Sequence, residues 1–364
     1  MKCSILEEDL AEVYRRDIPW EKLRGKSVLV TGAYGMLASY IIYMLAYLNE
    51  KAAMDVKIIA LARSKEKLRK RFGKLLDQNY FVPYISGLEG PLDIEEDIRY
   101  IIHAASLADP SCYKVRPIDV LKPNVIGNYY LLELAEQKNV DGYLLFSSGD
   151  IYGAIDGKKT ICENDYGSMD TLDIHNCYSE SKRMAETMCR AWQQQKGTPV
   201  TIARICHTYA PTMDTEHDAR VFASFVNDIL TERDIIMKSD GSSKRTFCYI
   251  ADALAAFFLI LLRGKHGEAY NVCNTKEFYS IAQLADTLAG LYPESGIQVV
   301  RREREKDDMY VENSVASRIP QDNSKLRQLG WEAVYDIQSG FKRTVEGIRQ
   351  MAGDSDKEGG LCKR

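Results

Sequence analysis

The stretch KSVLVTGAYGMLASY (26–40) decides the fold of this chain. A short apolar strand (26–32) runs into a glycine-containing turn, and the apolar segment after the turn has the length and composition of a helix. Gly32 permits the tight turn, Gly35 lets a pyrophosphate approach the backbone at the helix N-terminus, and the small Ala38 lets helix and strand pack closely. A lone glycine pattern is weak evidence, but its position inside a β-turn-α unit predicts a dinucleotide-binding turn.

Short apolar segments alternate with amphipathic helical segments through the first half of the chain. After the first strand, we predict strands over 55–63, 98–106, 142–148 and 198–205. Continuous apolar strands between helices indicate a parallel sheet covered on both faces, so we expect the α/β class and a Rossmann doubly wound parallel sheet. Beyond about residue 206 the strands become sparse, which predicts a smaller C-terminal α/β substrate-binding domain at the carboxyl edge of the sheet.

Four parts are predicted along the chain. The first residues are acidic and amphipathic, and the last residues are polar and rich in glycine, which is typical of a disordered tail. The parts are an N-terminal helical extension (1–25), a NAD(P)-binding Rossmann domain (26–206) to which the chain returns around 245–262, a mainly substrate-binding domain (207–352) and the disordered tail (353–364).

The composition limits the classes of function. Asp and Glu (52) slightly outnumber Lys and Arg (48), so the net charge of −4 provides no basic field and we expect no nucleic-acid partner. No apolar run approaches the roughly 18 residues that span a bilayer, so we expect no membrane association. The nine cysteines form no CxxC pair and no metal-ligand spacing, which favours reduced thiols, a cytoplasmic protein and no metal site.

A tyrosine and a lysine lie one turn apart in CYSESKRMAE (177–186), a segment with helical character. Because residues i and i+4 share one helix face, we expect the ammonium of Lys182 near the phenol of Tyr178. A nearby positive charge favours the phenolate and lowers the tyrosine pKa from about 10, so that Tyr178 can act as a general base. Ser147 and Ser148 end a predicted strand, where two serines alone would more often cap the strand.

Five motifs occur in order at domain-wide spacing: TGxxGxxA (31–38), HAASLADP (103–110), LLFSSGDIYG (144–153), Tyr178-x-x-x-Lys182 and ARICHTYAP (203–211). Together they resemble the extended short-chain dehydrogenase/reductase family of nucleotide-sugar enzymes, from about residue 26 to 345. Within the family the chain is most similar to the UDP-glucuronate decarboxylase branch, through stretches such as DGSSKRTFCYIADAL and LGWEAVYDIQSGF. The resemblance implies bound NAD, a nucleotide-diphosphate sugar as substrate and a homodimer formed through two long helices.

The resemblance also implies a role for individual residues. The catalytic residues are Tyr178, Lys182, Ser148 and Asp150. The cofactor-binding residues are Gly32, Ala33, Tyr34, Gly35, Met36, Leu37, Arg63, Ala104, Ala105, Ser106, Asn124, Ser147, Tyr178, Lys182 and Ile205. The substrate-binding residues are Ser148, Gly149, Asp150, His207, Arg220, Arg245 and Arg318.

The chain departs from its relatives at the adenosine end of the cofactor. The relatives' acid for the ribose 2′-hydroxyl should end the second strand, but that strand ends in Ala62-Arg63. An arginine there can meet a 2′-phosphate, or it can be a solvated surface charge. NAD is therefore the predicted cofactor, and NADP stays open.

The residues after Ser148 bear on the reaction. By resemblance, the sugar C4 hydroxyl is oxidised to a transient ketone, and the sugar then loses carbon dioxide, loses water or takes hydride back on its other face. The dehydratases carry two adjacent acids where this chain has Gly149 and Asp150, and the epimerases usually carry no carboxylate there. We therefore predict a decarboxylating nucleotide-sugar lyase. The alternatives are a 4,6-dehydratase, a 4-epimerase and, last, a non-enzymatic relative that only binds the cofactor.

Overall fold

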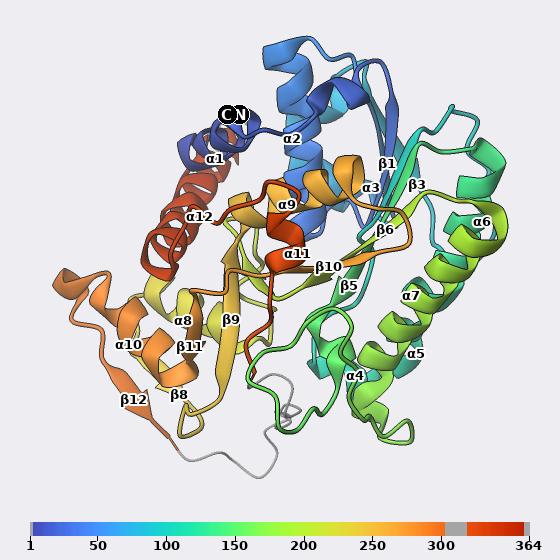
Figure 1. The fold of residues 1–364 in the computed structure, drawn as a ribbon. Helices are drawn as coiled ribbons and strands as arrows, with labels where there is room; N and C mark the ends of the chain where they lie inside the picture. Colours follow the sequence, from blue (N-terminus) through green and yellow to red (C-terminus); the bar gives the residue numbers. More distant parts are fainter. Residues whose placement is uncertain (1–2, 303–318, 360–364) are drawn as a thin grey trace.

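A seven-stranded parallel sheet forms the centre of the molecule (Figure 1). The computed structural model describes residues 3–302 and 319–359, with side chains as far as residue 353. The strand order β10-β6-β5-β4-β1-β2-β3 reverses between β1 and β4, which confirms the predicted doubly wound fold. The strands are β1 (Ser27–Thr31), β2 (Lys57–Ala62), β3 (Phe81–Ile85), β4 (Tyr100–His103), β5 (Gly142–Ser148), β6 (Val200–Ile205) and β10 (Ala269–Val272).

Alternate side chains of the sheet enter two separate cores. Val28 and Val30 belong to one core and Leu29 belongs to the other, as the two-residue period of a strand requires. Each fully buried side chain of this kind stabilises the fold by about 1.5–3 kcal/mol. Figure 1 shows helices on both sides of the sheet. The first core includes α2 (Met36–Ala52) and α9 (Ile250–Arg263), and the second includes α6 (Asn128–Lys138) and α7 (Cys177–Lys196).

Two strands of this sheet lie outside the predicted strand ranges. Strand β3 contains Pro83, which is tolerated because β3 is an edge strand with one side free of ladder hydrogen bonds. Strand β10 has only four residues and pairs with β6. Because β10 follows α9, the return of the chain to the sheet lasts until Val272 and is longer than predicted, whereas β9 belongs to a different sheet.

A second region covers the carboxyl edge of the large sheet. It contains a three-stranded sheet, in the order β11-β9-β7, and a two-stranded sheet of β12 and β8. Its strands are β7 (His207–Tyr209), β8 (Ile235–Met237), β9 (Lys244–Tyr249), β11 (Phe278–Ser280) and β12 (Val299–Arg301), and its helices are α8 (Val221–Leu230), α10 (Ile281–Gly290) and η6 (Pro293–Ser295). Helix α11 (Ser324–Arg327) packs against β10 of the large sheet.

Short helices complete the described part of the chain. They flank the large sheet or follow its strands, and none of the described helices is long and apolar enough to cross a membrane. They are η1 (Trp20–Leu23), α3 (Lys65–Phe72), η2 (Gly73–Asp77), α4 (Ser111–Val115), α5 (Pro117–Lys122), η3 (Pro123–Gly127), η4 (Gly149–Tyr152) and η5 (Ile174–Asn176).

The first and last helices lie side by side (Figure 1). Helix α1 (Ser4–Arg15) carries Asp9, which is fully buried and accepts hydrogen bonds from Tyr249 Oη at 2.6 Å and Arg343 Nε at 2.9 Å. Helix α12 (Ile337–Gly359) carries Arg343 and continues through residues 353–359. This helix therefore extends into the predicted disordered tail (353–364), whose disorder stays a prediction; residues 360–364 lie outside the described residues.

Candidate active site

The glycine turn after β1 has no room for a side chain at its first glycine. Gly32 has a φ of +66°, and a Cβ atom there would lie 2.8 Å from Cα of Ala105. The backbone N–H of Gly35 donates to Gly32 O at 2.8 Å, and α2 begins at the next residue without a side-chain cap. A positive φ, a close backbone approach and an uncapped helix N-terminus form a cradle that suits a pyrophosphate. The other predicted residues of this turn are Ala33, Tyr34, Met36 and Leu37.

Thr31 ties this turn to the loop after β4. Its Oγ1 accepts the backbone N–H groups of Ala104 (3.2 Å) and Ala105 (3.1 Å), and it lies 2.9 Å from Nδ1 of His103. Burial lowers the pKa of His103 to about 3, so its ring is neutral. The Oγ of Ser106, which follows Ala105 in the chain, is buried and has no hydrogen-bond partner among the described residues. A buried hydroxyl without a partner beside the glycine turn fits a ligand contact.

Three other predicted cofactor residues have positions that do not by themselves indicate a contact with a ligand. Arg63 is exposed, one residue after the end of β2, where the sequence predicted it. Asn124 is fully buried, and its Nδ2 donates to Ser181 Oγ at 2.9 Å, so its amide holds α7 against η3. Ile205 ends β6 and packs against the first core.

The predicted tyrosine and lysine lie on α7 and are both buried. Lys182 Nζ lies 5.8 Å from the centre of the Tyr178 ring and donates to Phe146 O at 2.7 Å. Burial lowers the pKa of Lys182 to about 7, while the nearby Glu186 opposes this shift. Burial and the charge of Asp150 raise the pKa of Tyr178 above its ordinary value. The predicted lowering of the Tyr178 pKa by Lys182 is therefore not found in this arrangement, because desolvation by burial has the largest effect on this phenol.

Ser148 connects Tyr178 to the predicted acid. Its hydroxyl lies close enough to that of Tyr178 to oppose the raised pKa of the phenol, and its Oγ accepts the backbone N–H of Asp150 at 3.1 Å. The carboxyl group of Asp150 is solvent-accessible, but the surrounding protein raises its pKa, while Arg245 and His175 oppose that shift. Three of the predicted catalytic residues and one predicted substrate arginine are therefore brought together.

Two aromatic residues near Tyr178 were not predicted as site residues. The ring of Tyr113 is stacked on the ring of Tyr178, with centroids 5.2 Å apart and an angle of 8°. The ring of His175 also contacts the ring of Tyr113, with centroids 5.5 Å apart, and its Nδ1 is buried without a hydrogen-bond partner among the described residues. Tyr113 ends the stretch HAASLADPSCY that resembles the family, which is the one signal that pointed to it. We call Ser148, Asp150, Tyr178, Tyr113 and His175 the open cluster.

Ser147, one residue earlier, belongs to a different group of side chains. Its Oγ donates to Glu186 Oε1 at 2.5 Å, and Glu186 also binds Arg204 through two of the guanidinium nitrogens, at 3.0 and 2.7 Å. The predicted contact of the Ser147 hydroxyl with the cofactor is therefore not supported, because alternate side chains of β5 leave opposite faces of the sheet.

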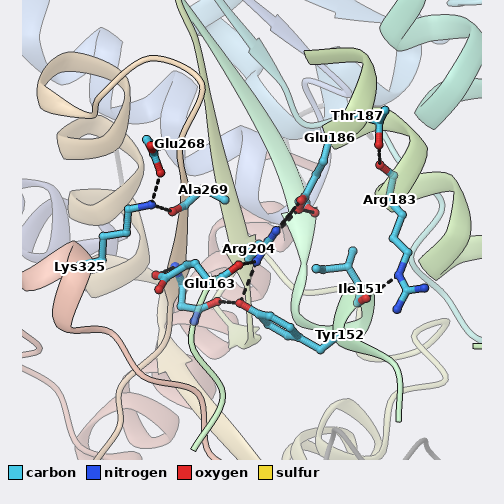
Figure 2. Close-up of polar contacts among 12 residues, drawn as sticks. Ile151, Tyr152, Glu163, Arg183, Glu186, Thr187, Arg204, Glu268, Ala269 and Lys325 are labelled. Atoms are coloured by element: carbon cyan, nitrogen blue, oxygen red, sulfur yellow. Dashed lines mark hydrogen bonds and ion pairs between the residues drawn. The ribbon is translucent and has the colours of Figure 1, made fainter. Parts of the chain in front are cut away.

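Arg204 is the centre of this group (Figure 2). Its Nη1 donates to Tyr152 Oη at 3.1 Å and to Glu163 O at 2.6 Å. The Tyr152 hydroxyl donates to Asn271 Oδ1 at 2.5 Å. None of these side chains has a buried polar atom without a partner. We call Ser147, Tyr152, Glu163, Glu186, Arg204 and Asn271 the closed network; an arginine inside the apolar strand VTIARI was the sequence signal for it.

Three predicted substrate residues meet where the second region covers the sheet. His207 packs against Phe222 and Phe247, and burial together with Arg245 and Arg220 lowers its pKa to about 3. Its ring is therefore neutral and can only hydrogen-bond. Arg245 is buried on β9, and Arg220 precedes α8, where it pairs with Asp218.

The remaining predictions concern Arg318 and metal ligands. Arg318 lies outside the described residues. In the part of the chain that the structure describes, no group of three or more His, Cys, Asp or Glu side chains is placed to hold a metal ion.

The chain is similar to proteins of known activity. A model of the NAD dependent epimerase/dehydratase family matches residues 28–273. UDP-glucuronic acid decarboxylase 6 of Arabidopsis thaliana is 30% identical over 328 residues, 90% of each chain, and UDP-glucuronic acid decarboxylase 1 of Xenopus tropicalis is 29% identical over 326 residues, 89% of this chain and 72% of the relative.

Solved structures share the fold at low sequence identity. UDP-glucose 4-epimerase from Thermotoga maritima has a TM-score of 0.73 at 21% identity and covers 90% of this chain and 99% of its own. dTDP-glucose 4,6-dehydratase from Bacillus anthracis has a TM-score of 0.72 at 19% identity and covers 89% of this chain and 97% of its own. With the family match over most of its length, the chain belongs to the NAD dependent epimerase/dehydratase family.

Proposed function

We propose that this protein is an NAD-dependent nucleotide-sugar decarboxylase that acts on UDP-glucuronate. The carrying observation is the arrangement after β5, where Ser148 lies beside Tyr178 and accepts the backbone N–H of Asp150, and where Gly149 provides no second acid. The names of the curated relatives, UDP-glucuronic acid decarboxylases, support the same activity.

The residues around the glycine turn fit NAD. Gly32, Gly35 and the uncapped N-terminus of α2 would hold its pyrophosphate, because an added Cβ at Gly32 would fill that cradle. The unpartnered hydroxyl of Ser106 and the buried Lys182 would contact it further along the same edge. When bound, NAD supplies the acceptor for hydride from the sugar C4. Arg63 is the residue that would decide between NAD and NADP, and its role stays a prediction.

Tyr178 and Ser148 act at the hydroxyl that is oxidised. Tyr178 takes the proton of the sugar hydroxyl at its Oη, and Ser148 hydrogen-bonds the reacting oxygen. The raised pKa of Tyr178 makes the phenolate costly, and the Ser148 hydrogen bond and the positive charge of Arg220 both oppose this shift. Protonation of Lys182, whose pKa is about 7, adds a second positive charge, on the helix α7 that also carries Tyr178.

The residues next to Tyr178 favour loss of carbon dioxide over loss of water. A ketone β to a carboxylate promotes decarboxylation without a proton donor to a leaving hydroxyl. Gly149 removes the donor that a dehydratase needs, and Asp150 remains as one acid beside Ser148. Arg245 and Arg220 would bind the diphosphate, since a planar guanidinium matches phosphate oxygens, and Arg318 would contact the sugar.

Product analysis tests this proposal. The purified protein, supplied with NAD, is incubated with UDP-glucuronate and with UDP-, dTDP-, GDP- and CDP-hexoses, and the products are identified by mass spectrometry. We expect carbon dioxide and a UDP-pentose from UDP-glucuronate. A 4-keto-6-deoxy sugar from a hexose, or an isomer of unchanged mass, would contradict the proposal in favour of a dehydratase or an epimerase.

We further propose that the protein is a homodimer that pairs through α5, η3, α6 and α7. These elements pack together and expose a group of large apolar side chains, which is unusual for a surface that faces only water. The side chains are Ile118 (65% exposed), Leu121 (37%), Ile126 (44%), Tyr129 (40%) and Met184 (50%).

Light scattering tests this interface. It should show a dimer that the double substitution Ile118→Glu and Met184→Glu disrupts, whereas Val334→Glu, at an exposed apolar residue elsewhere, leaves the dimer intact. The predicted cytoplasmic location stays a prediction.

A further inference from the structure

The side chain of Gln321 occupies the space next to Gly149. A Cβ atom added at Gly149 would overlap Nε2 of Gln321 and would lie 3.2 Å from its Cδ and 3.4 Å from its Oε1. The amide therefore lies where the side chain of residue 149 would otherwise be. Ser148 and Asp150 flank this position in the chain, so the amide is beside the open cluster.

Gln321 is 9% exposed, and its Oε1 is buried without a hydrogen-bond partner among the described residues. An unpaired buried acceptor of this kind is unfavourable, and most such groups in proteins have a partner. Because this one lies beside residues that act on the substrate, a bound ligand is the natural source of the missing partner.

The backbone around Gln321 holds the amide in place. The N–H of Ile161 donates to Pro320 O at 3.0 Å, and the N–H of Asp322 donates to Ile161 O at 2.8 Å. Cys273 Sγ donates to Gln321 O at 3.5 Å. With hydrogen bonds on both sides of residue 321, the side chain starts from a fixed backbone and suits specific recognition.

We propose that Gln321 determines substrate specificity by hydrogen-bonding the carboxyl group of the sugar. This inference rests on the proposed function and names the group that recognises the uronic acid. An amide can donate N–H to a carboxylate and can accept from a neighbouring hydroxyl, but it does not release a proton. Gln321 therefore binds the carboxylate that is lost as carbon dioxide, and it supplies no acid for the elimination of water at the place that Gly149 leaves open.

The experiment compares two ligands that differ in the carboxyl group. Dissociation constants of UDP-glucuronate and UDP-xylose, which lacks the carboxyl, are measured by calorimetry in the NAD-loaded Tyr178→Phe background, where no turnover occurs. KM and kcat for UDP-glucuronate are measured with Tyr178 present. The variants are Gln321→Ala, Gln321→Glu and the control Gln328→Ala, which removes an exposed glutamine of the same segment.

We expect Gln321→Ala to weaken binding of UDP-glucuronate and raise its KM by about 10- to 100-fold, the effect of losing a hydrogen bond to a charged group. Binding of UDP-xylose should stay unchanged. Gln321→Glu should weaken the binding of UDP-glucuronate further at pH 8, because two ionised carboxylates repel each other. Binding should recover as the pH is lowered and one carboxylate becomes protonated. Gln328→Ala should match the parent protein.

An equal loss of affinity for both ligands, or an unchanged affinity for UDP-glucuronate in a folded Gln321→Ala protein, would overturn the inference. Thermal unfolding shows whether each variant is folded, and Gln321→Asn serves as a milder variant if Gln321→Ala is not. If the wild-type protein decarboxylates UDP-glucuronate while Gln321→Ala behaves identically, only the role of Gln321 fails. If the wild-type protein releases no carbon dioxide, the proposed function fails, and the binding comparison then decides separately whether Gln321 recognises a carboxylate.

Discussion

Ser147 and Ser148 are neighbours at the end of β5, but they belong to two contrasting groups of polar side chains. Ser147 joins the closed network, in which Glu186 and Arg204 satisfy one another and no buried polar atom lacks a partner. Ser148 joins the open cluster, in which Nδ1 of His175 has no partner in the described part of the chain and Asp150 is exposed. Satisfied polar groups hold the scaffold together, and unsatisfied ones are available to a ligand. Two serines one position apart in the chain therefore have different hydrogen-bond environments.

The largest effect is expected at the centre of the open cluster. Tyr178→Phe removes the phenolic oxygen that is proposed to take the substrate proton, so kcat should fall by about 10⁴-fold, the upper end for one general acid or base. NAD binding, followed by fluorescence titration, should be retained because the phenyl ring still stacks on Tyr113. Turnover at the wild-type rate would remove Tyr178 from the mechanism.

A substitution in the closed network should lower the free energy of unfolding. Glu186→Ala leaves the guanidinium of Arg204 buried without its carboxylate, and loss of one partner of such a pair costs about 3–5 kcal/mol. The free energy of unfolding from denaturant titration measures this change. Glu180→Ala, at a half-exposed glutamate of the same helix, is the matched control and should change stability by less than about 1 kcal/mol. An equal loss in both variants would mean that the network is not a special source of stability.

The two serines test the contrast directly. Ser148→Ala removes a hydrogen bond to the reacting oxygen and should lower kcat by about 10²- to 10³-fold. Ser147→Ala should lower stability by about 1 kcal/mol, through its lost bond to Glu186, with little change in kcat. Steady-state kinetics and thermal unfolding of both proteins give the comparison. If Ser147→Ala were the less active variant, the assignment of the two groups would be reversed.

The smallest effect concerns the lysine that lies between the two groups. Burial lowers the pKa of Lys182 to about 7, and the negative charge of Glu186 acts against this lowering. If the protonated amine is the active form, activity should decline above pH 7. Glu186→Gln removes the opposing charge, so the alkaline limb of kcat/KM should move to lower pH. A shift to higher pH, or no shift in a folded variant, would show that Lys182 does not govern this limb.

The effect of Lys182 on stability should run opposite to its effect on activity: stability should rise with pH where activity declines. Because its folded pKa is below its unfolded value, the unfolded chain binds more protons between about pH 7 and 10.5, and stability should rise with pH across this range. Lys182→Met should lose that part of the rise. Denaturant titrations at several pH values distinguish this effect from the change in activity.

Much of the fold followed from local patterns. The glycine turn, the alternation of apolar strands with helices and the Tyr178–Lys182 spacing each depend on a few neighbouring residues, whose backbone preferences act over one turn or one strand. Strands β3 and β10 lie outside the predicted strand ranges because pairing with β2 and β6, rather than their own composition, makes them strands.

The sequence by itself determined the doubly wound fold, the position of the cofactor turn and the membership of Ser148, Asp150 and Tyr178 in one site. Only the tertiary structure decided that Ser147 donates to Glu186, that desolvation raises the pKa of Tyr178, and that Gln321 lies against Gly149. Local patterns are set by interactions between residues close in the chain. Desolvation, hydrogen-bond satisfaction and the filling of space depend on residues far apart in sequence, and packing alone brings those together.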